Sequence, residues 1–377
     1  MTAPAVVDLD DPAAVGAADP GEMLRAIASS AAQVREAALL TRDAGVARLG
    51  EGGRPRAVVV CGMGGSGIAG DVLAAVTGMA TPTPVLSHRG YGLPSWVGPG
   101  DVVIAVSCSG STEETLSALE EAVRRGCPLV VVGAEGSPVH SLAQRGRAVF
   151  VPVTQGRQPR ASVWSLSTPL VMAGHVLGLC DGSDDVVDAG AAALEDVAVR
   201  CRPDADELVN PAKQLARHLH GAVPVVWGAS PLAGVAAYRL ACQLNENAKV
   251  PATWGVLPEA NHNQVVALDG PFAGTPSGGD FFRDRADEPE TARLAVVLLR
   301  DADEHPQVAR RADVTEQLAR ERGVPVHVLR PEGSSAFERL ARLVALGDYA
   351  STYLAVLQGI DPTPVDAITA LKAAIAR

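Results

Sequence analysis

The sequence predicts an α/β fold of two doubly wound domains, each with a parallel sheet flanked by helices. Short runs of β-branched, apolar residues alternate with helical patterns, which is typical of βαβ units with parallel strands. A similar order of strands and helices returns in the second half of the chain. The length of 377 residues also favours two domains over one.

The first half opens with residues 1–20, a stretch rich in Ala, Pro and Asp that we expect to be a flexible tail. A helical pattern follows from Gly21 to about Leu49. Residues 21–200 are then predicted to form the N-terminal domain. Its strands are expected at 57–61, 101–106, 128–133 and 148–153, and its helices at about 68–76 and 112–125.

The second half, residues 201–377, follows a helix bounded by the polar stretch 181–185 and by Cys201-Arg202-Pro203. Residues 270–290 are rich in Gly, Pro and Asp and are predicted to be a loop. The strands are expected at 224–228, 293–299 and 324–329, and the helices at 231–245, 305–322, 335–359 and 363–377.

Composition excludes several classes of protein. The chain is 47% hydrophobic, 20% charged and only 3% aromatic, with a formal net charge of −11, which argues against a nucleic-acid or anionic-membrane surface. No apolar run approaches the roughly 18 residues of a transmembrane helix, and no signal peptide is expected at the N-terminus. The six cysteines are scattered without a CxxC pair, so we interpret them as reduced thiols and expect a cytoplasmic location.

Lysine is rare in this chain. Of 32 basic residues, only Lys213, Lys249 and Lys372 are lysines. A codon bias towards arginine is the simplest cause. On that background a retained lysine is a candidate for a role that arginine cannot fill, such as releasing a proton.

A glycine-rich turn follows the first strand. Gly62-Met63-Gly64-Gly65-Ser66-Gly67 matches GxGxxG, but a dinucleotide site needs an acidic residue near the end of the next strand, where this chain has Val85–Arg89. An arginine there could suit a 2′-phosphate, so NADP stays open as an alternative, as does a purely structural turn. Backbone N–H groups at a helix N-terminus and the hydroxyl of Ser66 favour a phosphate ester, with Gly65 and Ser66 in contact with it.

A second polar turn follows the strand 101–106. Ser107, Ser109 and Thr112 can direct three hydroxyls into one concave turn, Gly110 permits a tight backbone, and Thr112 can cap the next helix. Because the carboxyl ends of neighbouring parallel strands share one edge of a sheet, both turns are expected there, where ligands bind. The sequence therefore predicts a phosphate-binding cradle.

These motifs carry a family resemblance. GMGGSGIAGD (62–71) and SCSGSTEETL (107–116) resemble the sugar isomerase (SIS) domain. NENAKVP (245–251), LPEANHN (257–263) and DPTPV (361–365) with Leu371-Lys372 extend the resemblance to the bifunctional phosphoglucose/phosphomannose isomerases of archaea and bacteria. It covers nearly the whole chain from Gly21 onward, and it implies that both domains are of the SIS type.

The resemblance implies four catalytic residues. Glu246 would be the carboxylate that moves a proton between C1 and C2 of the sugar, and Arg160 would stabilise the enediolate. His262 would open the sugar ring from the other subunit of a dimer, with Asn261 and Asn263 fixing its tautomer. Lys372 would be the ring-opening lysine. Lys249 follows Glu246 by three residues, and we expect it to have a structural role and to brace Glu246.

The resulting prediction is a homodimeric isomerase with shared active sites that interconverts glucose 6-phosphate or mannose 6-phosphate with fructose 6-phosphate through a cis-enediol. No cofactor is expected, and no metal. His218 and His220 lie on a predicted helix and only weakly suggest a metal, and the HxH-plus-carboxylate pattern of zinc-dependent mannose-6-phosphate isomerases does not occur. The alternatives are a non-catalytic SIS protein that binds a sugar phosphate for regulation and an NADP oxidoreductase.

Overall fold

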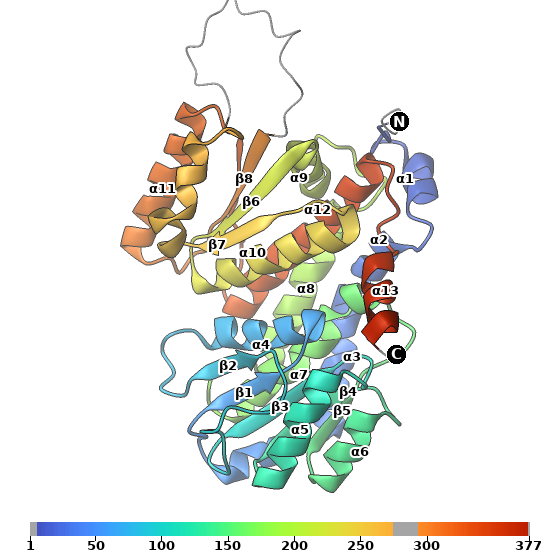
Figure 1. Ribbon diagram of the computed structural model, residues 1–377, viewed down its shortest axis with the longest axis vertical. Coiled ribbons are helices and arrows are strands. Elements are labelled where there is room, and N and C mark those ends of the chain that lie inside the picture. Colours follow the sequence, from blue (N-terminus) through green and yellow to red (C-terminus); the bar gives the residue numbers. More distant parts are fainter. Residues whose placement is uncertain (1–5, 274–292, 376–377) are drawn as a thin grey trace, which may run out of the picture. The chain divides into compact units, whose positions relative to one another are not determined.

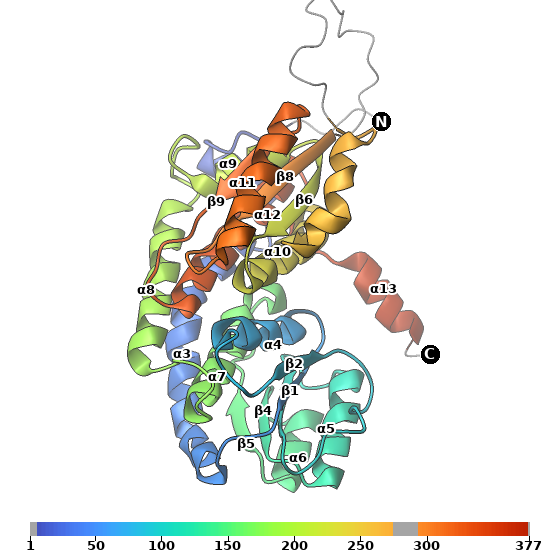
Figure 2. The ribbon, with the colours of Figure 1, turned by 90° about the vertical axis from the view of Figure 1, so that its left-hand side faces the viewer.

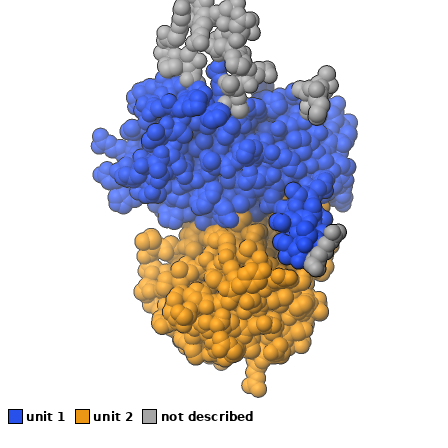
Figure 3. All heavy atoms as spheres, viewed as in Figure 1, with its two compact units in different colours: residues 1–27, 197–331, 343–377 blue, residues 28–196, 332–342 orange. Residues whose placement is uncertain are grey.

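The chain divides into two compact units, which are coloured separately in Figure 3. The structure is a computed structural model that describes residues 6–273 and 293–375. Unit 1 comprises residues 1–27, 197–331 and 343–377, and unit 2 comprises residues 28–196 and 332–342. The sequence placed the boundary at residue 200, close to the switch at Val197, but it did not foresee that two further segments change unit.

Unit 2 contains a five-stranded parallel sheet in the order β2-β1-β3-β4-β5 (Figure 1). Alternate residues of each strand serve opposite faces, so that Val58 and Val60 pack with α4 and α7 while Val59 packs with α5 and α6. Cores on both faces make this a doubly wound sheet. The strands are β1 (Val58–Cys61), β2 (Val85–His88), β3 (Val102–Ser107), β4 (Leu129–Gly133) and β5 (Val149–Pro152), and the helices are α3 (Ser30–Asp43), α4 (Gly64–Thr77), α5 (Glu113–Arg125), α6 (Pro138–Arg145), α7 (Val163–Val176) and α8 (Asp184–Arg200).

Unit 1 contains a four-stranded parallel sheet in the order β7-β6-β8-β9. Helix α10 packs on β6 and β7, and α11 packs on β8 and β9, as Figures 1 and 2 show. The strands are β6 (Ala222–Gly228), β7 (Thr253–Val256), β8 (Arg293–Leu299) and β9 (Val326–Leu329), and the helices are α1 (Pro12–Ala18), α2 (Met23–Ala28), α9 (Pro211–Leu219), α10 (Pro231–Gln243), α11 (Pro306–Glu321), α12 (Ala336–Leu357) and α13 (Asp366–Ile375). Two helices pass from one unit to the other: residues 197–200 of α8 belong to unit 1, and residues 336–342 of α12 belong to unit 2.

The expected flexible tail is wrong for residues 6–20. The Asp11 carboxylate caps the first turn of α1 by accepting from the N–H groups of Ala13 and Ala14, with proline next in the chain. Leu9 and Val15 are 0% and 1% exposed. Buried apolar side chains and an N-capped helix thus occur in a segment whose composition suggested no regular structure.

The helical pattern 21–49 is broken at Ser29 into α2 and α3, and a 3₁₀ turn, η1 (Val46–Gly52), follows. Most of the predicted loop 270–290 lies outside the described residues. Helix α12 is long and apolar enough to cross a membrane, but 89% of its most apolar window is buried inside the protein, as in the core helix of a globular fold.

Candidate active site

The two polar turns of unit 2 come together as predicted. Strands β1 and β3 are neighbours in parallel register, so that the turn 62–67 after β1 and the turn 107–112 after β3 lie at the same edge of the sheet. The N–H of Cys108 donates to Oγ of Ser66 over 3.3 Å and joins the two turns directly. This edge is therefore one continuous cradle of hydroxyls and backbone N–H groups.

The hydroxyls of the second turn have different surroundings. Ser107 is 1% exposed, and its Oγ accepts from the N–H of Gly110 at 3.1 Å and lies 3.0 Å from Oγ1 of Thr112. Ser109 is exposed, and its Oγ accepts from Ser111 at 3.3–3.4 Å. Ser107 thus shapes the turn, while the hydroxyl of Ser109 lies where a ligand can reach it.

Thr112 differs from its prediction. It occupies the N-cap position of α5 but makes no side-chain cap hydrogen bond, because its hydroxyl faces Ser107 instead.

Gly110 has φ +72°, and a Cβ there would lie 2.1 Å from Oγ of Ser137, so only glycine suits this turn.

Residues 62–67 and 107–112 of the two turns carry a single titratable side chain, the thiol of Cys108. Burial raises the pKa of the Cys108 thiol, which therefore stays protonated between the two turns. Met63, the N-cap residue of α4, makes no side-chain cap hydrogen bond. An anion is a natural partner for the N–H groups of an uncapped first helical turn.

Arg89, the arginine that could have bound the 2′-phosphate of NADP, forms an ion pair within the protein. The guanidinium of Arg89 pairs with the carboxylate of Asp71 on α4 and donates to the carbonyl of Gly67 at 3.2 Å. Asp71 also accepts from Oγ of Ser87 at 2.7 Å. Because the charge of Arg89 is balanced within this cluster, the site favours a simple phosphate ester over a 2′-phosphorylated dinucleotide.

In unit 1, Glu246 lies at the end of α10, as predicted, in a π-helical turn, η3 (Leu244–Ala248). Its side chain is half-buried. The buried amide of Asn247 holds the turn by donating to Ser351 Oγ at 3.0 Å and to Thr352 Oγ1 at 3.4 Å on α12. Single π turns of this kind are frequent at functional sites.

His262 ends the 3₁₀ turn η4 (Glu259–His262), which follows β7 at the carboxyl edge of the sheet, and it is exposed. The flanking asparagines do not fix its tautomer. The amide of Asn261 donates to Thr315 Oγ1, and that of Asn263 donates to Glu259 Oε1, each at 2.8 Å. Both amides hold the backbone of the turn, and this leaves the imidazole at the surface.

The remaining candidates lie on separate elements. Lys372 is exposed on α13, and Arg160 is half-buried in a 3₁₀ turn, η2 (Pro159–Ala161), directly before α7. Glu246, His262 and Lys372 thus belong to unit 1, whereas Arg160 and the cradle belong to unit 2. Within the described residues, no group of three or more His, Cys, Asp or Glu side chains is arranged to hold a metal ion.

A link through Lys249 was not foreseen in full. The sequence suggested that Lys249 braces Glu246, and its ammonium does donate to the carbonyl of Glu246 at 2.6 Å. It also donates to the carbonyl of Pro364, just before α13, at 2.8 Å. The rarity of lysine was the signal that pointed to this residue, but no local pattern could identify a partner so distant in the chain.

Two SIS-type units with a hydroxyl-lined anion cradle define the class: this is a protein of the sugar-phosphate SIS group. Family models agree, since the SIS domain matches residues 54–177 and the bacterial phospho-glucose isomerase C-terminal SIS domain matches residues 208–375. More narrowly, the chain belongs to the bifunctional phosphoglucose/phosphomannose isomerase family. The predicted fold class and family resemblance are thereby confirmed.

The relatives behind that assignment cover most of both chains. The bifunctional phosphoglucose/phosphomannose isomerase of Caldicellulosiruptor bescii is 34% identical over 315 residues, which is 84% of this chain and 88% of the relative. That of Aquifex aeolicus is 31% identical over 84% of this chain and 89% of its own. The D-glucosamine-6-phosphate 4-epimerase of Sulfolobus acidocaldarius, a partial match, is 31% identical over 54% of this chain and 61% of its own.

Solved structures share the fold. A hypothetical protein from Thermus thermophilus has a TM-score of 0.69 at 16% identity and covers 94% of this chain and 90% of its own. A glucose-6-phosphate isomerase from Chlamydia trachomatis has a TM-score of 0.64 at 13% identity and covers 93% of this chain and 77% of its own. At such identities the likeness concerns the fold alone.

Proposed function

We propose that this protein is an aldose–ketose isomerase that interconverts glucose 6-phosphate and mannose 6-phosphate with fructose 6-phosphate through a cis-enediol. Membership of the family supports the reaction. The observation that carries the substrate class is the hydrogen bond from the N–H of Cys108 to Ser66, because it joins two hydroxyl-bearing turns into one cradle for a phosphate.

Four residues are proposed to perform the chemistry. Glu246 carries the proton between C1 and C2, His262 and Lys372 open the sugar ring, and Arg160 stabilises the negative charge of the enediolate. The π turn supports the role of Glu246, because it presents a half-buried carboxylate at the end of a buried helix.

A homodimer with shared sites is part of the proposal. The exposed position of His262 supports it, since both neighbouring amides hold the turn and the imidazole lies at the surface, where it can reach a partner's site. We place the enzyme in the cytoplasm on the composition of the chain. A non-catalytic SIS protein is the alternative, but it would not be expected to keep Glu246, His262 and Lys372 together.

A coupled assay of the purified protein tests the activity, with glucose, mannose and fructose 6-phosphates supplied in turn. Glucosamine 6-phosphate belongs in the panel because one relative is named an epimerase of that sugar. We expect turnover of both aldoses to fructose 6-phosphate. Turnover of none of the three hexose phosphates would contradict the proposal.

The Glu246→Gln variant tests the base. It keeps the shape of the side chain but removes its basicity, so kcat should fall by at least about 10²–10⁴-fold while sugar-phosphate binding is retained. Glu321→Gln, an exposed glutamate on α11, is the matched control. The wild-type protein in D₂O tests the enediol: fructose 6-phosphate should yield aldose with deuterium at C2, because an enediol intermediate exchanges its proton with solvent. Wild-type turnover in Glu246→Gln would remove this carboxylate from the mechanism.

A further inference from the structure

Lys249 joins two segments that carry proposed catalytic residues. Its ammonium donates to the carbonyls of Glu246 at 2.6 Å and Asn247 at 3.3 Å, both in the π turn, and to the carbonyl of Pro364 at 2.8 Å. Lys249 and Pro364 are 115 residues apart, and α13 with Lys372 begins two residues after Pro364. One side chain therefore connects the turn of Glu246 to the base of the helix of Lys372.

The backbone of Lys249 is also unusual. It has φ 58° and ψ 25°, in the left-handed region where glycine is favoured and a residue with a long side chain is uncommon. Such conformations persist when the surrounding structure holds them, and they cluster at functional sites. This conformation ends the π turn and lets the side chain fold back over the carbonyls of Glu246 and Asn247.

Helix α13 depends on its base for its position within unit 1. None of its described residues is buried, and Figure 2 shows it extending away from the helices of unit 1. Its base is held where Thr363 packs against Gly21, since a Cβ on that glycine would lie 2.0 Å from Thr363 Oγ1, and where Pro364 meets Lys249. Losing the Lys249 contact would remove one of these two attachments.

We propose that Lys249 is a positioning residue that holds the Glu246 turn and the start of α13 in a fixed relation. It thereby positions the carboxylate of Glu246 and the ring-opening Lys372 to act on the same substrate. The inference rests on the proposed function, from which the roles of Glu246 and Lys372 come. A compact ammonium offers three donors to three converging carbonyls, whereas the planar guanidinium of arginine does not match them.

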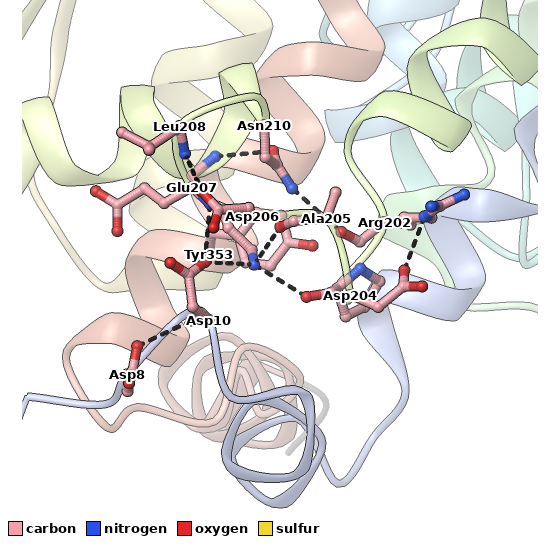
Figure 4. Close-up of polar contacts among 12 residues, drawn as sticks. Asp8, Asp10, Arg202, Asp204, Ala205, Asp206, Glu207, Leu208, Asn210 and Tyr353 are labelled. Carbon is pink, nitrogen blue, oxygen red and sulfur yellow. Dashed lines mark hydrogen bonds and ion pairs between the residues drawn. The ribbon is translucent and has the colours of Figure 1, made fainter.

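The first test compares two lysines that donate to carbonyls. Lys249→Met removes the charge, and Lys249→Arg keeps the charge but not the geometry. Lys213→Met is the control from the same unit. The Lys213 ammonium is buried, donates to the carbonyls of Pro203 (2.9 Å) and Ala205 (2.6 Å) and pairs with Asp10 (3.2 Å). Figure 4 shows the polar residues of this cluster, with Ala205 and Asp10 labelled.

A misplaced catalytic group costs up to about 100-fold in rate, so both Lys249 variants should lose roughly 10–100-fold in kcat with little change in KM. Lys213→Met should lower stability without that loss of kcat. Glu246→Asp adds a second readout. If Lys249 acts by placing Glu246, the loss in the double variant Lys249→Met/Glu246→Asp should be smaller than the product of the single losses. In the control double variant Lys213→Met/Glu246→Asp, the kcat losses of the two single variants should multiply.

Amide hydrogen exchange reports the link without any activity. Lys249→Met should speed exchange in residues 244–252 and in α13 together, while Lys213→Met should leave both segments as in the wild type. Wild-type kcat in the Lys249 variants, losses that multiply, or unchanged exchange would each overturn the inference. A wild-type protein that isomerises no hexose 6-phosphate would overturn the proposed function instead, and exchange would still decide whether Lys249 holds the two segments.

Discussion

The two serines of the cradle should respond differently to the same substitution. Ser109 is exposed and its hydroxyl lies at the surface of the turn, so Ser109→Ala removes a contact to the ligand and little else. A hydrogen bond to a charged group is worth about 1.5–3 kcal/mol, which corresponds to an increase in KM of about 10–150-fold. The free energy of unfolding should hardly change.

Ser107→Ala should instead weaken the protein itself. The hydroxyl of Ser107 is buried, and its loss removes its contacts with the N–H of Gly110 and the hydroxyl of Thr112. Because the Gly110 N–H keeps the backbone carbonyl of Ser107 as an acceptor at 3.0 Å, we expect a cost of about 0.5–1.5 kcal/mol of stability. KM should rise as well, because the turn that presents Ser109 loses the side-chain contacts of Ser107.

Steady-state kinetics with fructose 6-phosphate and urea unfolding measure the two effects side by side. Ser141→Ala, an exposed serine on α6 of the same unit, should change neither quantity. An unchanged KM in Ser109→Ala would refute the phosphate assignment. Equal losses of stability in Ser109→Ala and Ser107→Ala would refute the division of roles between them.

Two further predictions concern the dimer and the effect of acid. Mixing Glu246→Gln subunits with His262→Ala subunits should restore part of the activity, because a hybrid dimer contains one site with both residues intact; exchanged mixtures as inactive as either parent would exclude shared sites. Burial lowers the pKa of both His218 and His327, whose rings lie 5.4 Å apart, so below about pH 6.5 the unfolded chain takes up protons that the folded state does not. Urea unfolding should therefore show stability falling as the pH drops through this range, and less steeply in His327→Gln; a pH-independent wild type would contradict it.

Strong local patterns allowed much of the fold to be predicted. The strand predicted at 293–299 coincides with β8, because the unbroken apolar run that follows Arg293 is bounded by charged residues and admits few other structures. The helix predicted at 305–322 coincides with α11 to within a residue at each end. The meeting of the two polar turns followed from the general rule that parallel strands place their carboxyl ends at one edge.

The features that were missed depend on partners far along the chain. Strand β7 has only four residues, and Thr253 and Trp254 are exposed at the edge of the sheet, so no buried run marks it. Residues 6–20 are ordered by contacts such as the hydrogen bond from the N–H of Val7 to the carbonyl of Leu357. Asn261 bonds to Thr315 rather than to its neighbour His262, and nothing local to PEANHN identifies that partner.

The three lysines have different surroundings in the structure. We expected a retained lysine to do what arginine cannot, with release of a proton as the example. The structure points to geometry for two of them, because the ammonium groups of Lys213 and Lys249 each lie among backbone carbonyls that converge on a single small cation. Only Lys372, exposed on α13, is left for a role in proton transfer. Each of these two ammonium groups also contacts a residue distant in sequence, Asp10 for Lys213 and Pro364 for Lys249, and the contact of Lys249 joins the turn of Glu246 in the proposed active site to the segment before α13.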